Sequence, residues 1–124
     1  MFNVEGTTIS ISRGDTGAVR FVADVTIPDT DESYTFGEND WAIFSIKTMD
    51  GELVRMVYAQ MTDNAFTVTF HNADTEALAT TNYTWDVRYV INAYWEGGVI
   101  VDGDQVITPE LPMNFNILNV VGEV

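Results

Sequence analysis

The 124-residue sequence contains no cysteine and little positive charge. Without cysteine the chain has no disulfide, no thiolate nucleophile and no cysteine-ligated zinc site. Five Lys and Arg residues stand against nineteen Asp and Glu residues, which gives a formal net charge of -14 at pH 7. Because this charge repels nucleic-acid phosphates and anionic membrane surfaces, we expect neither nucleic acid nor membrane among the partners. Cations and basic protein surfaces are compatible with it.

Long apolar runs and extended helical patterns are also missing. No run reaches the roughly 18 apolar residues of a transmembrane helix. The amino-terminal stretch MFNVEGTTIS lacks the basic and apolar regions of a secretory signal, so we expect an unprocessed product made in the cytoplasm. The only helical signal is one turn at 73–78, which argues against an α/β fold. A hydrophobic content of 46% suffices for the core of one domain spanning 1–124.

What the sequence does contain is apolar residues at every second position, the pattern of half-buried strands. These segments recur at intervals of roughly ten residues and are separated by turn-forming residues. Residues 41–61 are expected to form a hairpin with Asp50-Gly51 at its tip, and further turns are expected at Gly97-Gly98 and at 102–104. Between them, 28–40 is expected to be a polar, acidic loop. The pattern predicts an all-β fold, an immunoglobulin-like sandwich of about seven to eight antiparallel strands.

The clearest alternation covers 82–95, which is expected to be one strand with its odd-numbered residues, through Trp95, on one face. Leu78, Tyr83 and Trp85 fit a tyrosine corner, in which a Tyr near the start of the penultimate strand hydrogen-bonds back across the corner. Trp85 then stands where an immunoglobulin domain carries a disulfide cysteine. We expect its indole to fill that space.

No catalytic constellation is visible. The single histidine, His71, is expected to face solvent, and neither a cysteine nor a nucleophile elbow accompanies it. Nineteen acids leave a two-carboxylate glycosidase open by count, but a small sandwich offers little cleft in which to desolvate a substrate. We therefore expect a protein that is not an enzyme and that uses no cofactor.

The acidic loops are candidates for calcium binding, because calcium prefers several oxygen ligands from adjacent loops. The candidate ligands are Asp29, Asp31, Asp102 and Asp104, and none of their segments matches an EF-hand. Charge runs in loops are more often a solvated rim, which is the interpretation we favour over a metal site.

Three aromatic residues are candidates for an interface. Trp41 and Trp95 lie near strand ends, and Tyr94 projects to the polar face of its strand. Exposed aromatics at such positions often serve protein contacts. Stacking on sugars is the alternative use of the same side chains.

Residues Arg13, Gly14, Asp15 and Thr16 contain an Arg-Gly-Asp tripeptide between the first two expected strands. The tripeptide is the signature of a cell-adhesion loop, and it also has the composition of a tight turn. Gly14 allows the backbone to turn, and Asp15 can accept hydrogen bonds from nearby amides. We expect a turn, with Arg13 paired to an acid such as Asp86, and a loss of stability when Asp15 is removed.

Taken in order, these segments resemble the immunoglobulin-like N-terminal domains of bacteriophage upper-baseplate and tail-associated proteins. The resemblance rests on short motifs spread over nearly the whole chain. The matching residues are Arg13, Gly14, Asp15 and Thr16, then Asp40, Phe44 and Lys47, then Asp74, Thr75, Leu78, Tyr83, Trp85 and Asp86. Asn82 and residues 110–112 depart from the family pattern, which has glycine at both places.

The resemblance implies a non-enzymatic structural component of a tailed bacteriophage virion, made in the host cytoplasm. Such a subunit is an adaptor or decoration of the tail, baseplate or capsid surface, and it acts through protein–protein packing. Its partners are other virion structural proteins, with a homo-oligomer as a further possibility. The alternative is a carbohydrate-binding or host-surface adhesion module, with or without calcium.

Overall fold

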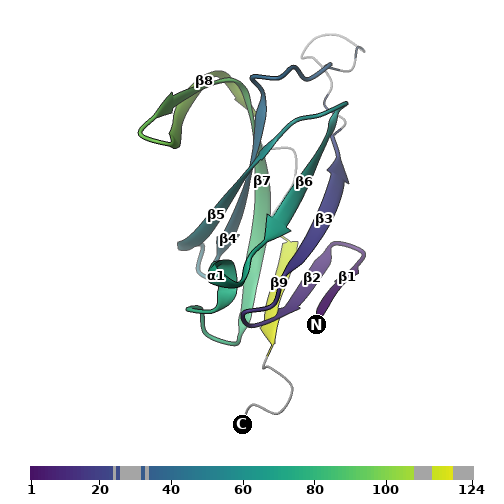
Figure 1. Ribbon diagram of the computed structural model, residues 1–124, viewed down its shortest axis with the longest axis vertical. Coiled ribbons are helices and arrows are strands. Elements are labelled where there is room, and N and C mark those ends of the chain that lie inside the picture. Colours follow the sequence, from purple (N-terminus) through teal and green to yellow (C-terminus); the bar gives the residue numbers. More distant parts are fainter. Residues whose placement is uncertain (24, 26–31, 33, 108–112, 119–124) are drawn as a thin grey trace.

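The computed structural model describes residues 1–23, 25, 32, 34–107 and 113–118. The described residues form two β-sheets and one short helix. A larger sheet has the strand order β1-β2-β9-β7-β4-β5, with β8 paired to β7, and a smaller sheet consists of β3 and β6 (Figure 1). The elements are β1 (Phe2–Glu5), β2 (Thr8–Ser12), β3 (Gly17–Val22), β4 (Trp41–Lys47), β5 (Leu53–Gln60), β6 (Ala65–Phe70), α1 (Asn72–Thr75), β7 (Asn82–Glu96), β8 (Val99–Ile107) and β9 (Met113–Leu118).

This arrangement is an all-β, immunoglobulin-like sandwich, which confirms the fold class predicted from the alternating pattern. The 41–61 hairpin, the helical turn after β6 and the turn at Gly97-Gly98 are also confirmed. Two expectations were wrong. The described residues contain nine strands, because β1 adds a strand against β2, and the pairing is not wholly antiparallel. Strand β2 runs parallel to β9, with Ile9 opposite Phe115 and Ile11 opposite Ile117.

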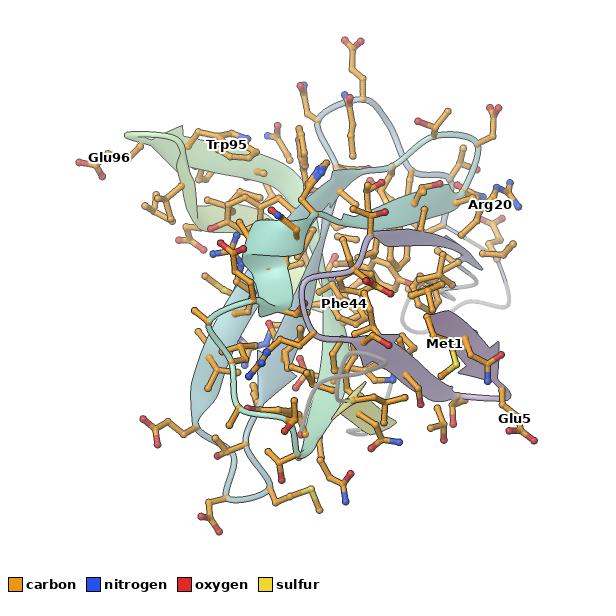
Figure 2. The ribbon with its side chains drawn as sticks, turned by 60° about the horizontal axis from the view of Figure 1, so that its bottom comes forward. Met1, Glu5, Arg20, Phe44, Trp95 and Glu96 are labelled. Atoms are coloured by element: carbon orange, nitrogen blue, oxygen red, sulfur yellow. The ribbon has the colours of Figure 1, made fainter. Side chains whose placement is uncertain are left out.

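The core between the two sheets is built from aromatic rings. Phe44 on β4 has no exposed surface and lies at the centre of the molecule in Figure 2. Trp85 on β7 stacks on Phe44 with ring centroids 5.3 Å apart, and it contacts Phe21 of β3 at 5.4 Å. The Phe21–Trp85 contact joins the two sheets, as the disulfide between the sheets does in antibody domains. This contact is one of several aromatic contacts that link the two sheets in this cysteine-free chain.

The corner before β7 has the hydrogen bond expected of a tyrosine corner. The Tyr83 hydroxyl donates to the carbonyl oxygen of Ala79 at 3.0 Å. Two residues further on, the Trp85 indole N–H donates to the Thr7 carbonyl oxygen at 2.9 Å. Leu78 packs, half-buried, against the core. These contacts anchor the start of β7 to the β1–β2 turn and to the end of the preceding loop.

The Arg-Gly-Asp segment is a turn between β2 and β3. Gly14 has φ of +82°, and its N–H donates to the hydroxyl of the fully buried Thr75 at 2.9 Å. The Asp15 N–H donates to the Ser12 carbonyl oxygen, and the Asp15 carboxylate pairs with the amino terminus. Asp86, named as one acid that Arg13 could pair with, forms an ion pair with Lys47 at 2.7 Å.

Replacing Gly14 with alanine is expected to lower the free energy of unfolding by about 1–2 kcal/mol, because a Cβ is strained at this positive φ. Replacing Asp15 with alanine should cost about 0.5 kcal/mol or less, because both partners of its ion pair are largely exposed. Urea denaturation of the two variants measures both effects. A larger loss for Asp15→Ala than for Gly14→Ala would contradict this view of the turn.

Candidate functional site

The β7–β8 hairpin curls away from the sandwich, as the strand labelled β8 shows in Figure 1, and the backbone of β7 departs from regular strand geometry at Asn92. Asn92 has φ of +50°, in the left-handed region that asparagine tolerates better than most residues. The pairing of β7 with β8 also shifts register between Tyr94 and Trp95. We call residues 93–103 the arm. Trp95 and Glu96 lie on it, far from Phe44 (Figure 2).

The bend overturns one expectation about β7. The expected single face of odd-numbered residues from Tyr83 to Trp95 holds through Tyr89, which is buried between the sheets. Beyond the bend and the register shift the alternation no longer applies, and Trp95 reaches the opposite face of the larger sheet. That face carries Trp41 and Tyr58, and we call it the outer face because it points away from β3 and β6.

A buried carboxylate holds the base of the arm. Asp40, which is 4% exposed, accepts a hydrogen bond from the Asn92 N–H at 2.8 Å through Oδ1. Its Oδ2 accepts from the Gly37 N–H at 2.7 Å and from the Tyr34 hydroxyl at 3.0 Å. Burial, followed by the hydrogen bond to Asp40, raises the pKa of Tyr34. Asp40 thus ties the bend to the loop that precedes β4, and the sequence pattern gave no sign of this role.

Two of the three aromatic candidates meet on the outer face. Trp95 packs edge-to-face on Trp41, with centroids 4.9 Å apart and an interplanar angle of 76°. It also packs edge-to-face on Tyr58 at 5.4 Å and 87°. We call Trp41, Tyr58 and Trp95 the aromatic cluster. Its rings are nearly perpendicular, so they do not form a flat platform of the kind on which sugar rings stack.

Tyr94, the third candidate, connects the arm to Asp104 at its base. Its hydroxyl donates to the Asp104 carboxylate, and the side-chain amide of Asn92 donates to the same carboxylate at 2.9 Å. The hydrogen bond from Tyr94, and then the one from Asn92, lower the pKa of Asp104. The same Tyr94–Asp104 bond raises the pKa of Tyr94.

Replacing Tyr94 with phenylalanine is expected to raise the pKa of Asp104 toward its ordinary value of 3.8, because the largest cause of its lowering is removed. A group with a lowered folded-state pKa stabilises the fold above its ordinary pKa, and that contribution is lost as the pH falls through the folded-state pKa. Wild type should therefore lose more stability than the variant on acidification. Carboxyl-carbon NMR titration measures the shift, with Tyr58→Phe as the control. An unchanged Asp104 titration in Tyr94→Phe would refute the assignment.

A groove of about 230 Å³ lies between the arm and the outer face. Its walls include Ile43 and Met56 from the sheet and Val101 and Val106 from β8, and Arg88 lies among them. The arm approaches β7 closely here, since a Cβ on Gly103 would lie 2.4 Å from the Val90 side chain. Glycine at this position therefore permits the curl that forms the groove.

The calcium candidates do not come together within the described part of the chain. Asp29 and Asp31 lie outside the described residues. Asp102 and Asp104 lie inside β8 rather than in the turn expected at 102–104. Asp104 already accepts the two hydrogen bonds described above, and Asp102 accepts one from the Gly103 N–H. Among residues 1–23, 25, 32, 34–107 and 113–118 no group of three His, Asp or Glu side chains could hold a metal ion.

His71 is exposed, as expected, and precedes the short helix α1. The backbone N–H of His71 donates to the buried Asp74 carboxylate at 2.7 Å, and Asp74 also pairs with Arg55 of β5 at 2.6 Å. These contacts connect α1 to the larger sheet. In the part of the chain that the structure describes, no helix is long and apolar enough to cross a membrane.

Comparisons with protein-family models, with curated proteins and with solved structures gave no significant match to this chain.

Proposed function

We propose that this protein is a non-enzymatic structural component of a tailed bacteriophage virion. It serves as an adaptor or decoration subunit of the tail, baseplate or capsid surface and acts by packing against other virion proteins. The observation that supports this proposal best is the arm, which carries Trp95, Val99 and Val101 outside the sandwich with 42%, 46% and 56% of their surface exposed. The resemblance of the RGDT turn and of the corner residues to phage baseplate domains supports the assignment to a virion.

The composition of the outer face favours protein packing. Tryptophan, tyrosine, methionine and arginine are enriched in protein interfaces, and the aromatic cluster, Met56 and Arg88 supply all four on one surface. Contiguous exposed apolar surface of this kind marks interaction sites in soluble proteins. Binding at this surface requires no chemistry from the chain beyond shape, apolar contact and charge.

The carbohydrate-binding alternative is the less favoured one, since the edge-to-face rings of the aromatic cluster do not form a continuous flat platform for a sugar. Isothermal titration with host-surface glycans, with and without Ca²⁺, tests that alternative directly. Heat of binding that disappears in Trp95→Ala would favour adhesion over structural packing.

The proposal is tested on virions of the phage that encodes the chain. Mass spectrometry of purified particles should find the protein in a constant copy number per particle. Particles stripped of it should rebind the purified protein and should rebind Trp95→Ala poorly. Val22→Ser is the matched control, because Val22 is an exposed apolar residue on β3, away from the arm. Absence from the particles together with failure to rebind would overturn the proposal.

A further inference from the structure

We infer that the groove between the arm and the outer face binds an apolar side chain of an extended partner segment that carries lysine or arginine beside it. The inference rests on the proposed packing function and specifies its site and the chemistry of its partner. It is carried by three properties of the groove, namely its exposed apolar walls, its preformed shape and the distribution of charge around it.

The walls are apolar and open to solvent. Met56 on β5 is 40% exposed, and Val101 and Val106 on β8 are 56% and 49% exposed. They come from segments far apart in the sequence, so their gathering here is a product of the bend at Asn92. Covering these side chains removes apolar surface from water, which is the principal favourable term in protein association. The volume of the groove suits a single large side chain rather than a helix.

The shape of the groove exists before any partner arrives. Asp40 holds the bend through the Asn92 N–H, and the Ala93 N–H donates to the Asn39 carbonyl oxygen at 2.9 Å. Trp95 packs on Trp41 and Tyr58, which fastens the arm to the sheet. A partner therefore meets a surface that needs little ordering, which lowers the entropic cost of binding.

The charges select a basic partner over a second copy of this chain. Asp102 lines the groove, and the same β7–β8 hairpin carries Glu96 and Asp104, in a chain with a net charge of -14. In a two-fold contact between copies the same patch faces itself, which brings these acids together. A partner with lysine or arginine beside its apolar side chain is instead attracted to these acids, and this attraction speeds its association with the groove.

In this proposal, Arg88 donates hydrogen bonds to the backbone of the partner segment. It lines the groove and is exposed, and its guanidinium makes no ion pair or hydrogen bond with any other described residue. Its guanidinium offers five N–H donors and no acceptor. An extended segment presents carbonyl oxygens along its length, so it can satisfy Arg88 while placing a side chain in the groove. This favours a polypeptide over a purely apolar ligand.

The test is a selection from a yeast-displayed random heptapeptide library on the folded protein, followed by titration of synthetic peptides of the enriched sequence. We expect a large apolar residue with lysine or arginine within two positions. Affinity should fall about tenfold or more in the double variant Met56→Ser, Val101→Ser, and it should fall with added salt. The matched control is Met49→Ser, Val22→Ser, which alters a more exposed methionine and a more exposed valine away from the groove. Amide NMR spectra verify that both variants are folded.

An acidic consensus, equal binding to the groove and control variants, or no enrichment at all would overturn the inference. Self-association in sedimentation that Met56→Ser, Val101→Ser abolishes would overturn it as well, in favour of a second copy. The outcome is separable from that of the proposed function. If the protein is a virion component and the groove variant assembles normally, the inference fails alone. If groove-dependent basic peptides bind but virions lack the protein, the virion assignment fails alone.

Discussion

Replacing Trp85 with alanine is expected to lower the free energy of unfolding by about 4 kcal/mol, the scale of large-to-small substitutions in cores. Trp85 is 5% exposed and lies between Phe44 of its own sheet and Phe21 of the opposite sheet. Truncation removes both ring contacts and leaves a cavity in the core. It also leaves the Thr7 carbonyl oxygen without the indole donor. Since domains of this size are stable by only about 5–15 kcal/mol, the variant should be close to unfolding under mild denaturant.

Urea denaturation followed by far-ultraviolet circular dichroism measures this loss. Trp85→Phe keeps one aromatic ring in the cross-sheet position but loses the hydrogen bond to Thr7, so it should cost about 1–2 kcal/mol. Trp41→Ala is the matched tryptophan control on the outer face, and it should cost less than half as much as Trp85→Ala because Trp41 is only partly buried. Equal losses for Trp41→Ala and Trp85→Ala would show that Trp85 does not link the sheets.

Local sequence pattern was sufficient to predict the parts of the fold that depend on neighbouring residues. Alternation of apolar residues marks a strand wherever one face is buried, so the hairpin around Gly51 and the inward positions up to Tyr89 followed from it. The tyrosine corner was predictable for the same reason, because Tyr83 and its acceptor Ala79 are close in sequence. The cross-sheet role of Trp85 followed once that corner was identified.

Features that depend on distant segments were not predictable from this pattern. The parallel pairing of β2 with β9 joins the two ends of the described chain, and no local signal encodes that register. Phe36 was assigned to a polar loop, yet it is buried against Tyr89, because a lone aromatic in an acidic segment has no periodicity to reveal it. The curl of the arm depends on Gly103 fitting against Val90, a contact that appears only after the strands pair.

The candidate interface also combines features that the local sequence predicts with features that depend on distant segments. Trp41 and Trp95 were named as interface candidates because they lie near strand ends, and their mutual contact depends on the bend at Asn92. Tyr58 was absent from the interface candidates, although it packs against Trp95 on the same surface. Tyr94 was included; it is 47% exposed, and its hydroxyl donates a hydrogen bond to Asp104. Sequence thus identified residue types suited to contact, whereas the backbone geometry decides which of them share a surface.

The second large effect is expected at Asp40, where replacement by alanine should lower the free energy of unfolding by about 3 kcal/mol. Hydrogen bonds to a charged acceptor are worth about 1.5–3 kcal/mol each, and part of this value is regained when water reaches the freed donors. The substitution deprives three donors of their acceptor, namely the N–H groups of Gly37 and Asn92 and the Tyr34 hydroxyl. Asp40→Asn retains one side-chain oxygen and should lose a smaller part of the stability, measured by urea denaturation.

The same substitution should also release the arm, and this consequence separates a positioning role for Asp40 from a general structural one. With the Asn92 N–H unpaired, the strained bend loses its main support, and Trp95 should separate from Trp41 and Tyr58. We therefore expect faster amide exchange at residues 93–103 and a red-shifted tryptophan emission in Asp40→Ala, while exchange in β4 and in β7 before the bend is accelerated far less. Trp85→Ala is the control, because it destabilises the whole sandwich and should raise exchange in the core and the arm together. Uniform acceleration in both variants would mean that Asp40 stabilises the sandwich without orienting the arm.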